Sequence, residues 1–203
     1  MKILFLSNNE ITDALFHWLA AEKENVMYYN KKISADDILK WDIEFIISYN
    51  YCFLLKDEVI QLLPHKVINL HTSYLPWNRG ASPNIWAFIE GTPCGVTIHE
   101  IDQGLDTGDI LAQSRLEFDF EKETLRSSYE KSHEAIQQLF QENWNAIKAG
   151  TLIPVKQQGK GSFHFKKQAD AFGHLINYDD TICTFLKKVK KNYGEIIYPF
   201  RRE

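Results

Sequence analysis

The sequence has few cysteines and no long apolar run. The 203 residues include three cysteines without the spacing of a metal motif, which favours a reducing compartment and argues against a disulfide framework. No apolar run approaches the length of a membrane span, and the N-terminus reads as a strand rather than a signal peptide. The sequence therefore predicts a cytoplasmic protein that does not enter a membrane.

An excess of positive charge is also absent. The formal net charge is −4, so the chain has no general field that would hold nucleic acid or an anionic membrane. With 44% hydrophobic residues and 203 positions, the chain can build one core domain with a small appendage. We therefore expect a small-molecule ligand and no nucleic-acid partner.

The first predicted turn lacks a glycine-rich phosphate loop. It reads Ser7-Asn8-Asn9-Glu10-Ile11, whereas a pyrophosphate cradle needs the close backbone approach that glycine allows. A dinucleotide bound in that way is therefore not expected. Asn8 and Asn9 either contact a polar substrate through their amides or simply form the turn, and the sequence leaves both interpretations open.

Short apolar runs alternate with helical patterns along the first 150 residues. Strands are predicted at 2–6, 26–29, 45–49, 67–70, 95–101 and 110–118. Helices are predicted after a cap near Thr12 or Asp13, from Ser82-Pro83 to Gly91, and from 124 to 149. This alternation predicts an α/β fold with a mostly parallel sheet and with sites at the carboxyl ends of strands.

The alternation stops after residue 150. The rest of the chain contains a predicted hairpin around Ser162–Phe165 and a basic helix from about Ile182. We therefore predict a catalytic domain over 1–150 and a small C-terminal extension over 151–203.

The densest group of polar side chains follows the predicted strand at 67–70. Asn69 and His71 are two residues apart, and alternate residues of a strand point to the same side. The loop behind them, Thr72–Gly80, is rich in Pro, Asn, Arg and Gly. A second polar turn, Asp102–Asp109, can bring a carboxylate beside an imidazole that titrates near neutral pH. Together these segments predict an active site.

Three ordered segments resemble the folate-dependent formyltransferases, namely Ile68–Gly80, Gly95–His99 and Leu105–Leu111. This family includes methionyl-tRNA, glycinamide ribonucleotide and sugar-nucleotide N-formyltransferases. The resemblance covers roughly residues 43 to 115. It implies a Rossmann-like core, with 10-formyltetrahydrofolate as the co-substrate that supplies the formyl group.

The resemblance also implies a catalytic set, which corresponds here to Asn69, His71 and Asp106. Formyl transfer to an amine needs these residue types. The Asn69 amide can donate to the developing oxyanion. His71 can take the amine proton, or stabilise the oxyanion when protonated. Asp106 can orient the imidazole and support its charge. Which group takes the proton stays open.

Simpler interpretations exist for each residue taken alone. An isolated Asn-x-His at a strand end is more often a hydrogen-bonded pair, and Asp106 alone would be a turn former; their conjunction favours function. His99 alternates within its strand and is predicted to be structural. A metal site built from His71, His99 and Asp106 lacks a short-spaced ligand pair, so no metal is predicted.

The resemblance places the folate against the loop after the third strand and the turn before the catalytic aspartate. An apolar loop that offers backbone groups suits a flat pterin, although Phe53–Leu55 could instead pack the core. The predicted folate contacts are Tyr51, Cys52, Phe53, Leu54, Leu55, Ile101, Asp102, Gln103 and Leu105.

Departures from the family patterns favour a nucleotide-linked amino sugar as acceptor. Methionyl-tRNA enzymes carry a further domain that would not fit after residue 150, and glycinamide ribonucleotide enzymes use a glycine-rich loop where this chain has Ser7-Asn8-Asn9. A short tail suits the sugar enzymes. We therefore expect formylation of a 4-amino-4,6-dideoxyhexose in surface polysaccharide biosynthesis.

The acceptor contacts are expected in the loop after the catalytic histidine. Trp77 offers an indole for the sugar or base, and Arg79 offers a guanidinium for phosphate. Either residue could also serve only the loop itself. The nucleotide end is expected at Lys160, His164 and Lys166.

Two other functions stay open. One is a formyl or acyl amidohydrolase that uses the same three residues on water. The other is a formylation module for a carrier-bound aminoacyl group, because the loop also resembles the formylation domain of gramicidin-type peptide synthetases. The long helix at 124–149 is compatible with a homodimer.

Overall fold

A computed structural model describes residues 1–194. Contacts divide the chain into two compact units, and each is described by itself. Unit 1 comprises Met1–His71, Ile98–Ala112 and Gln137–Gln157, and unit 2 comprises Thr72–Thr97, Gln113–Ile136 and Gln158–Glu203. This division does not test the expected boundary at residue 150, which stays a prediction.

A six-stranded sheet has the order β2-β1-β3-β4-β6-β7, and β6 and β7 pass from one unit into the other. The pairs β1–β2, β1–β3 and β3–β4 are parallel, which confirms the predicted mostly parallel α/β fold. The six strands are β1 Lys2–Leu6, β2 Asn25–Tyr29, β3 Phe45–Tyr49, β4 Val67–His71, β6 Gly95–Glu100 and β7 Ile110–Arg115.

Seven α-helices occur in the described part of the chain, together with two short 3-10 turns, η1 Glu10–Thr12 and η2 Gly173–Leu175. No helix within residues 1–194 is long and apolar enough to cross a membrane. The helices are α1 Asp13–Ala21, α2 Ala35–Trp41, α3 Asp57–Leu62, α4 Pro83–Glu90, α5 Leu125–Ala149, α6 Lys166–Asp170 and α7 Ile182–Tyr193.

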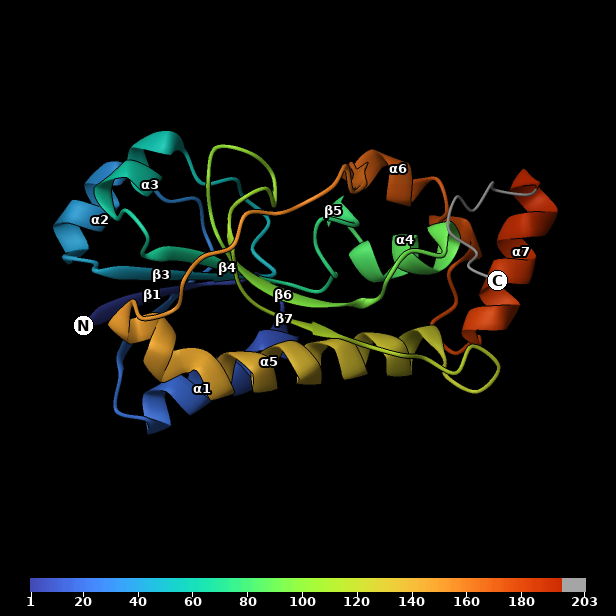
Figure 1. The fold of residues 1–203 in the computed structure, drawn as a ribbon, viewed down its shortest axis with the longest axis horizontal. Helices are drawn as coiled ribbons and strands as arrows, with labels where there is room; N and C mark the ends of the chain where they lie inside the picture. Colours follow the sequence, from blue (N-terminus) through green and yellow to red (C-terminus); the bar gives the residue numbers. More distant parts are fainter. Residues whose placement is uncertain (195–203) are drawn as a thin grey trace. The chain divides into compact units, whose positions relative to one another are not determined.

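Helices cover both faces of the sheet in unit 1, with α1 and α5 on one face and α2 and α3 on the other (Figure 1). Alternate residues of each strand supply the two faces. Phe5 of β1 meets Phe16 of α1, with ring centroids 5.9 Å apart. Leu4 and Leu6 instead join the core cluster that contains Ile38 of α2. Strands covered on both faces need continuous apolar runs, as β1 and β3 have.

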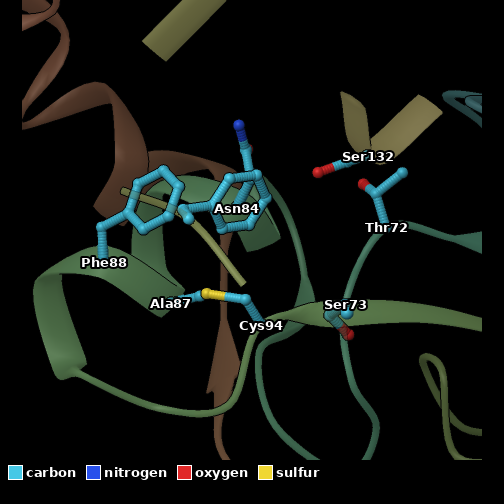
Figure 2. A pocket seen from close by; sticks show the side chains of 9 residues that line it. Thr72, Ser73, Asn84, Ala87, Phe88, Cys94 and Ser132 are labelled. Atoms are coloured by element: carbon cyan, nitrogen blue, oxygen red, sulfur yellow. The ribbon is translucent and has the colours of Figure 1, made fainter. Parts of the chain in front are cut away.

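Unit 2 has a core of its own. Residues of α4 and α7 pack together around Ile85, Phe88 and Phe185. A cavity of about 10 Å³ lies in this unit, enough for about one water molecule and too small for a substrate (Figure 2). None of the predicted site residues lines it; its walls are Thr72, Ser73, Asn84, Ala87, Phe88, Cys94, Gly95, Phe118 and Ser132.

Most predicted elements are present, and the differences are local. The sequence patterns missed α2 and α3, and β7 ends at Arg115 rather than residue 118. The predicted hairpin around 162–165 is wrong. Phe163–His164 form β8, which pairs in parallel with β5, Arg79–Gly80. The predicted helix from 182 is confirmed as α7.

The pH dependence of folding should depend on His133 of α5. This ring packs against Tyr129, with centroids 4.3 Å apart, and burial lowers the pKa of His133 to about 4. Between pH 6.5 and about 4 the unfolded chain binds a proton that the folded chain does not. The free energy of unfolding should therefore fall on acidification, by at most about 1.4 kcal/mol per pH unit from this group.

Replacing His133 by Gln should flatten this part of the stability curve, as measured by denaturant unfolding at several pH values. The exposed His174 in the same unit provides the matched His174→Gln control, which should keep the wild-type slope. Equal slopes for wild type and His133→Gln would contradict the prediction.

Candidate active site

The carboxyl end of β4 carries Asn69 and His71. In the parallel register with β3, Asn69 lies opposite Ser48. On the other side, the amide of Ile101 donates to the carbonyl of Val67 at 2.8 Å. Strands β4 and β6 are neighbours in the sheet, and Asn69 Nδ2 lies 3.3 Å from Nε2 of His99 on β6. This pairing brings the turn after β6 to the Asn69 side chain.

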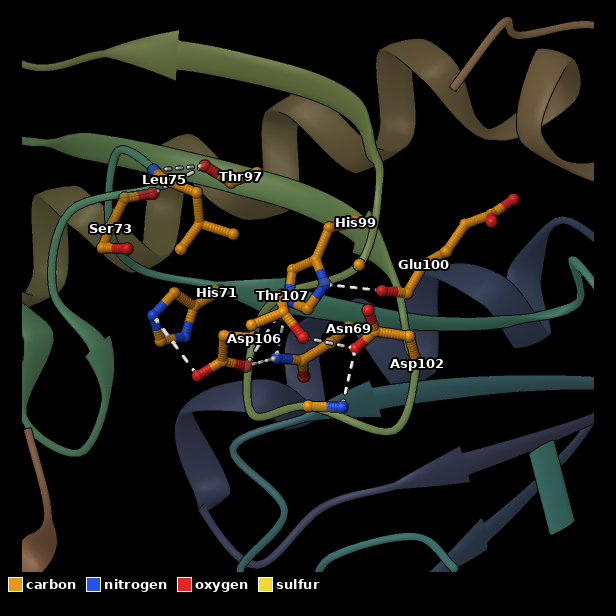
Figure 3. A network of polar contacts seen from close by, with 12 residues as sticks. Asn69, His71, Ser73, Leu75, Thr97, His99, Glu100, Asp102, Asp106 and Thr107 are labelled. Carbon is orange, nitrogen blue, oxygen red and sulfur yellow. Dashed lines mark hydrogen bonds and ion pairs between the residues drawn. The ribbon is translucent and has the colours of Figure 1, made fainter. Parts of the chain in front are cut away.

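An amide, an imidazole and a carboxylate meet at this point (Figure 3). Asn69 Nδ2 donates to Asp106 Oδ1 at 3.1 Å, and His71 Nε2 lies 3.8 Å from Asp106 Oδ2. The side chains of His71 and Asp106 are each 9% exposed. The structure thus brings together the three residues that the sequence predicted, in surroundings where charge interactions are stronger than in water.

His99 belongs to the same network, although the strand pattern indicated only a structural role. Its Nδ1 lies 2.7 Å from the carbonyl oxygen of Glu100, which can only accept, so Nδ1 carries the hydrogen. In the neutral ring, Nε2 then accepts from Asn69 Nδ2 at 3.3 Å. Asn69 therefore donates toward both Asp106 and His99. This arrangement fixes the orientation of its amide.

Hydrogen bonds inside the turn stabilise the segment that carries Asp106. Asp102 Oδ1 accepts from the Gly104 amide at 3.0 Å and from Thr107 Oγ1 at 2.6 Å. At Gly108 a Cβ atom would lie 1.8 Å from the carbonyl oxygen of Glu100, so only glycine fits there. Asp106 itself has a φ of +53°, a left-handed conformation that aspartate tolerates better than most residues.

Gln157 holds the same turn from outside. Its Nε2 donates to the carbonyl oxygens of Asp106 and Gly108, at 2.8 Å each. Both amide hydrogens are thereby committed to the backbone around the carboxylate. The sequence reasoning missed Gln157, because a glutamine 51 positions after Asp106 belongs to no motif that would point to it.

The predicted folate contacts fall into two groups. Phe53 and Leu54 are 38% and 73% exposed, whereas Tyr51, Leu55 and Ile101 pack against the core cluster of unit 1. The loop thus shows both of the expected alternatives, with some side chains at the surface and others in the core. Gln103 is exposed and Leu105 is half-buried in the turn before Asp106.

Hydrogen bonds commit several of these groups to the loops themselves. Tyr51 donates to the carbonyl of Lys31 at 2.7 Å, and burial raises the pKa of Tyr51 to about 12, so the phenol stays a donor. The Asp102 carboxylate is used inside its turn. Both hydrogen bonds within the turn go to Oδ1 of an exposed side chain, so a contact of Asp102 with folate through Oδ2 stays a prediction.

The first loop uses its asparagines structurally. Asn8 accepts from the amide of Cys52 at 2.9 Å and donates to the carbonyl of Asn30 at 2.7 Å. Asn9 caps η1 by accepting from the amide of Ile11. Of the two interpretations left open by the sequence, the structure supports the turn-forming one for both residues.

The predicted acceptor contacts lie in unit 2. Trp77 and Arg79 are half-buried, and Lys160 and Lys166 are exposed. His164 is 6% exposed, since its ring stacks on Trp86 with centroids 3.9 Å apart. The expected nucleotide contact of His164 stays a prediction, and the burial of the ring inside its own unit argues against it.

Side chains that could bind a metal ion were compared across the described part of the chain. Within residues 1–194, no group of three or more His, Cys, Asp and Glu side chains could hold a metal ion. The network around Asp106 instead consists of amide and imidazole donors and acceptors.

Residues 11–143 match the family model described as formyl transferase, and the chain belongs to this folate-dependent formyltransferase family. The methionyl-tRNA formyltransferase of Lachnospira eligens is 34% identical over 142 residues, which are 70% of this chain and 45% of that enzyme. This chain thus spans about half the length of that curated relative. The predicted family, with its enzyme class, is confirmed.

Solved structures of formyltransferases also resemble this chain. The formyltransferase PseJ from Anoxybacillus kamchatkensis is 36% identical, with a TM-score of 0.85 over 93% of this chain and 99% of that one. Its crystal structure contains UDP-4,6-dideoxy-4-formamido-L-AltNAc and tetrahydrofolate. A 4-N formyltransferase from Francisella tularensis shares the fold at 21% identity, with a TM-score of 0.73 over 91% of this chain and 86% of that one.

Gln157→Glu should slow formyl transfer by about ten-fold or more in kcat, with little change in folate affinity. An ionised Glu has no N–H to donate, so it would face the carbonyls of Asp106 and Gly108 without a hydrogen bond and release the turn. Steady-state kinetics checks this, with tetrahydrofolate binding measured in parallel.

The neighbouring Gln158 is exposed, so Gln158→Glu makes the same chemical change without touching the turn. This control should retain the wild-type kcat. Similar kcat values for the two variants would show that Gln157 does not position Asp106.

Proposed function

We propose that this chain transfers the formyl group of 10-formyltetrahydrofolate to the 4-amino group of a UDP-linked 4-amino-4,6-dideoxy sugar. One observation carries the proposal: the likeness to PseJ extends over 93% of this chain and 99% of that one at 36% identity. The ligands in that structure are a 4-formamido sugar nucleotide and tetrahydrofolate, which are the two products of such a transfer.

The loops of unit 1 suit the folate. Phe53 and Leu54 present apolar surface beside Tyr51, whose ring lies 5.4 Å from that of Phe53. A flat, partly apolar ligand needs such a surface together with backbone donors and acceptors at its edge. The co-substrate supplies the formyl group, and the protein supplies the orientation and the charge stabilisation.

His71 is the proposed proton acceptor. The acceptor amine attacks unprotonated, and neutral imidazole can take the proton that it loses as the new C–N bond forms. The bond between the formyl carbon and the folate nitrogen then breaks, and the imidazolium can return the proton to that leaving nitrogen. At 3.8 Å, Asp106 Oδ2 is beyond hydrogen-bond distance of His71 Nε2, but its charge stabilises the imidazolium that results. Both side chains are 9% exposed, so water screens this attraction only weakly.

Asn69 is the proposed donor to the formyl oxygen, where negative charge develops. Its two N–H groups point to Asp106 and His99, so one of these hydrogen bonds must be exchanged when the substrate binds. The more favourable exchange gives up the longer 3.3 Å contact with His99 Nε2, since hydrogen bonds to a carboxylate are stronger.

The identity of the acceptor can be tested directly. The purified chain with 10-formyltetrahydrofolate should add one formyl group to a UDP-4-amino-4,6-dideoxy sugar, detected by mass spectrometry, and should leave methionyl-tRNA unchanged. The net charge of −4 offers little attraction for tRNA phosphates, although the 34% identity to a methionyl-tRNA enzyme makes this comparison necessary.

Two further arms complete this test. Formate released without any acceptor would indicate an amidohydrolase instead, and transfer only to a carrier-bound aminoacyl group would indicate a peptide-synthetase-type module. Formylation of the tRNA with no reaction on the sugar would overturn the proposed acceptor while leaving the formyltransferase chemistry intact.

Asp106→Asn should lower kcat by about 100-fold or more, because the carboxylate charge beside His71 is lost. Asparagine tolerates the same left-handed backbone, so the turn should persist and tetrahydrofolate should still bind. Asp42 also has a φ of +53° and lies at the end of α2, which makes Asp42→Asn the matched control. A kcat within three-fold of wild type in Asp106→Asn would contradict the assigned role.

A further inference from the structure

A short parallel ribbon in unit 2 joins the loop after His71 to the C-terminal segment. Strand β5 pairs with β8, with Arg79 opposite Phe163 and Gly80 opposite His164. The amide of Arg79 donates to the carbonyl of Ser162, and that of Ala81 to the carbonyl of His164, at 3.0 Å each. The ribbon therefore places Phe163 beside the predicted phosphate contact Arg79.

Two glycines fix the register of this ribbon. At Gly80 a Cβ atom would lie 2.2 Å from the carbonyl oxygen of His164, and at Gly161 it would lie 2.0 Å from that of Pro76. Both glycines also have positive φ, +92° and +61°. Ser162 adds a hydroxyl that accepts from the amide of Asn78 at 2.9 Å. Side chains carried by the ribbon are thus held in defined positions.

The two sides of the ribbon are different. His164 points into unit 2, where it stacks on Trp86 and its Nε2 lies 3.1 Å from Glu90 Oε1. Neighbouring residues of a strand point to opposite sides, so Phe163 points away from α4, and its register partner Arg79 shares that side. The burial of His164 and the exposure of Phe163 agree with this assignment.

The outward side carries a pair of exposed aromatic rings, Phe163 and Phe165, called here the aromatic pair. The two side chains are 37% and 63% exposed. Their ring centroids are 4.5 Å apart with an interplanar angle of 87°, so one ring meets the other edge to face. Exposed rings in a defined arrangement offer binding surface without a further ordering cost.

Basic side chains surround the aromatic pair in the sequence and across the ribbon. Arg79 is the cross-strand neighbour of Phe163, while Lys160 and Lys166 are exposed residues of the same segment. Aromatic surface combined with cationic groups suits a ligand with a flat ring and negative charge. A nucleoside diphosphate has this chemistry, because its base can stack and its phosphates accept from guanidinium and ammonium groups.

We propose that the aromatic pair is the stacking platform for the base of the acceptor's nucleotide, with Arg79 contacting the diphosphate. This inference rests on the proposed function and names the residues that recognise its nucleotide end. It also replaces His164, which the sequence suggested, with its two outward-pointing neighbours.

Calorimetric titration with UDP tests the proposal on the full chain. Phe163→Leu combined with Phe165→Leu keeps apolar bulk but removes both π-faces, and should weaken UDP binding by about ten-fold or more. Binding of inorganic pyrophosphate, which has no base, should change less than two-fold. Phe163→Tyr combined with Phe165→Tyr should retain the affinity for UDP.

Phe120 provides the matched control, because it is also 37% exposed and lies in the same unit. Phe120→Leu should leave UDP affinity unchanged, and tetrahydrofolate binding in every variant checks that the chain is folded. Unchanged UDP affinity in the Phe163/Phe165 double leucine variant, or equal losses for UDP and pyrophosphate, would overturn the platform.

The proposed function is tested separately from the platform, by the formyl-transfer assay. If UDP binding depends on the aromatic pair but no UDP-amino sugar is formylated, the platform stands and the assigned reaction is wrong. If the sugar is formylated and the double leucine variant has an unchanged KM for it, the reaction stands and the platform is wrong.

Discussion

The position of one carboxylate depends on a backbone that would not adopt its conformation alone. Asp106 has a φ of +53°, which costs a non-glycine residue about 1 kcal/mol. Gln157 offsets this cost by donating to the carbonyls of Asp106 and Gly108, and Asp102 braces the turn from inside. Asp106 cannot swing away from Asn69 without breaking these bonds, so the site is organised before any ligand arrives.

The buried polar network has a second consequence. The Asn69 amide nitrogen is satisfied by Asp106 and His99, so it carries no unmet hydrogen bond that would destabilise the empty site. Because both N–H groups of Asn69 already have acceptors, a formyl oxygen must displace Asp106 or His99 from one of them. A donor already aimed by two protein acceptors needs little reorientation, and such preorganisation favours charge development in the transition state over binding of the neutral formyl group.

Local patterns predicted what depends on neighbours in sequence. Alternation along β4 placed Asn69 and His71 together, and the turn residues around Asp106 indicated a carboxylate. Pairings between segments that are far apart in the sequence produce no local pattern. The ribbon joins the loop at Asn78 to Ser162, 84 positions later, so Phe163–His164 looked like half of a local hairpin. Gln157 was missed, and His99 was given only a structural role, for the same reason, because their partners lie on other strands and turns.

The chain separates the groups proposed for chemistry from those proposed for recognition. The network of Asn69, His71, His99 and Asp106 lies wholly within unit 1, whereas Arg79 and the aromatic pair lie within unit 2. Substitutions at 163 and 165 can therefore change which base is held without altering the hydrogen bonds that set Asp106. Gly80 and Gly161 limit that freedom, because any side chain there would push the ribbon out of register. A change of nucleotide preference should thus arise at the outward-pointing positions 163 and 165, because these can vary while the ribbon stays paired.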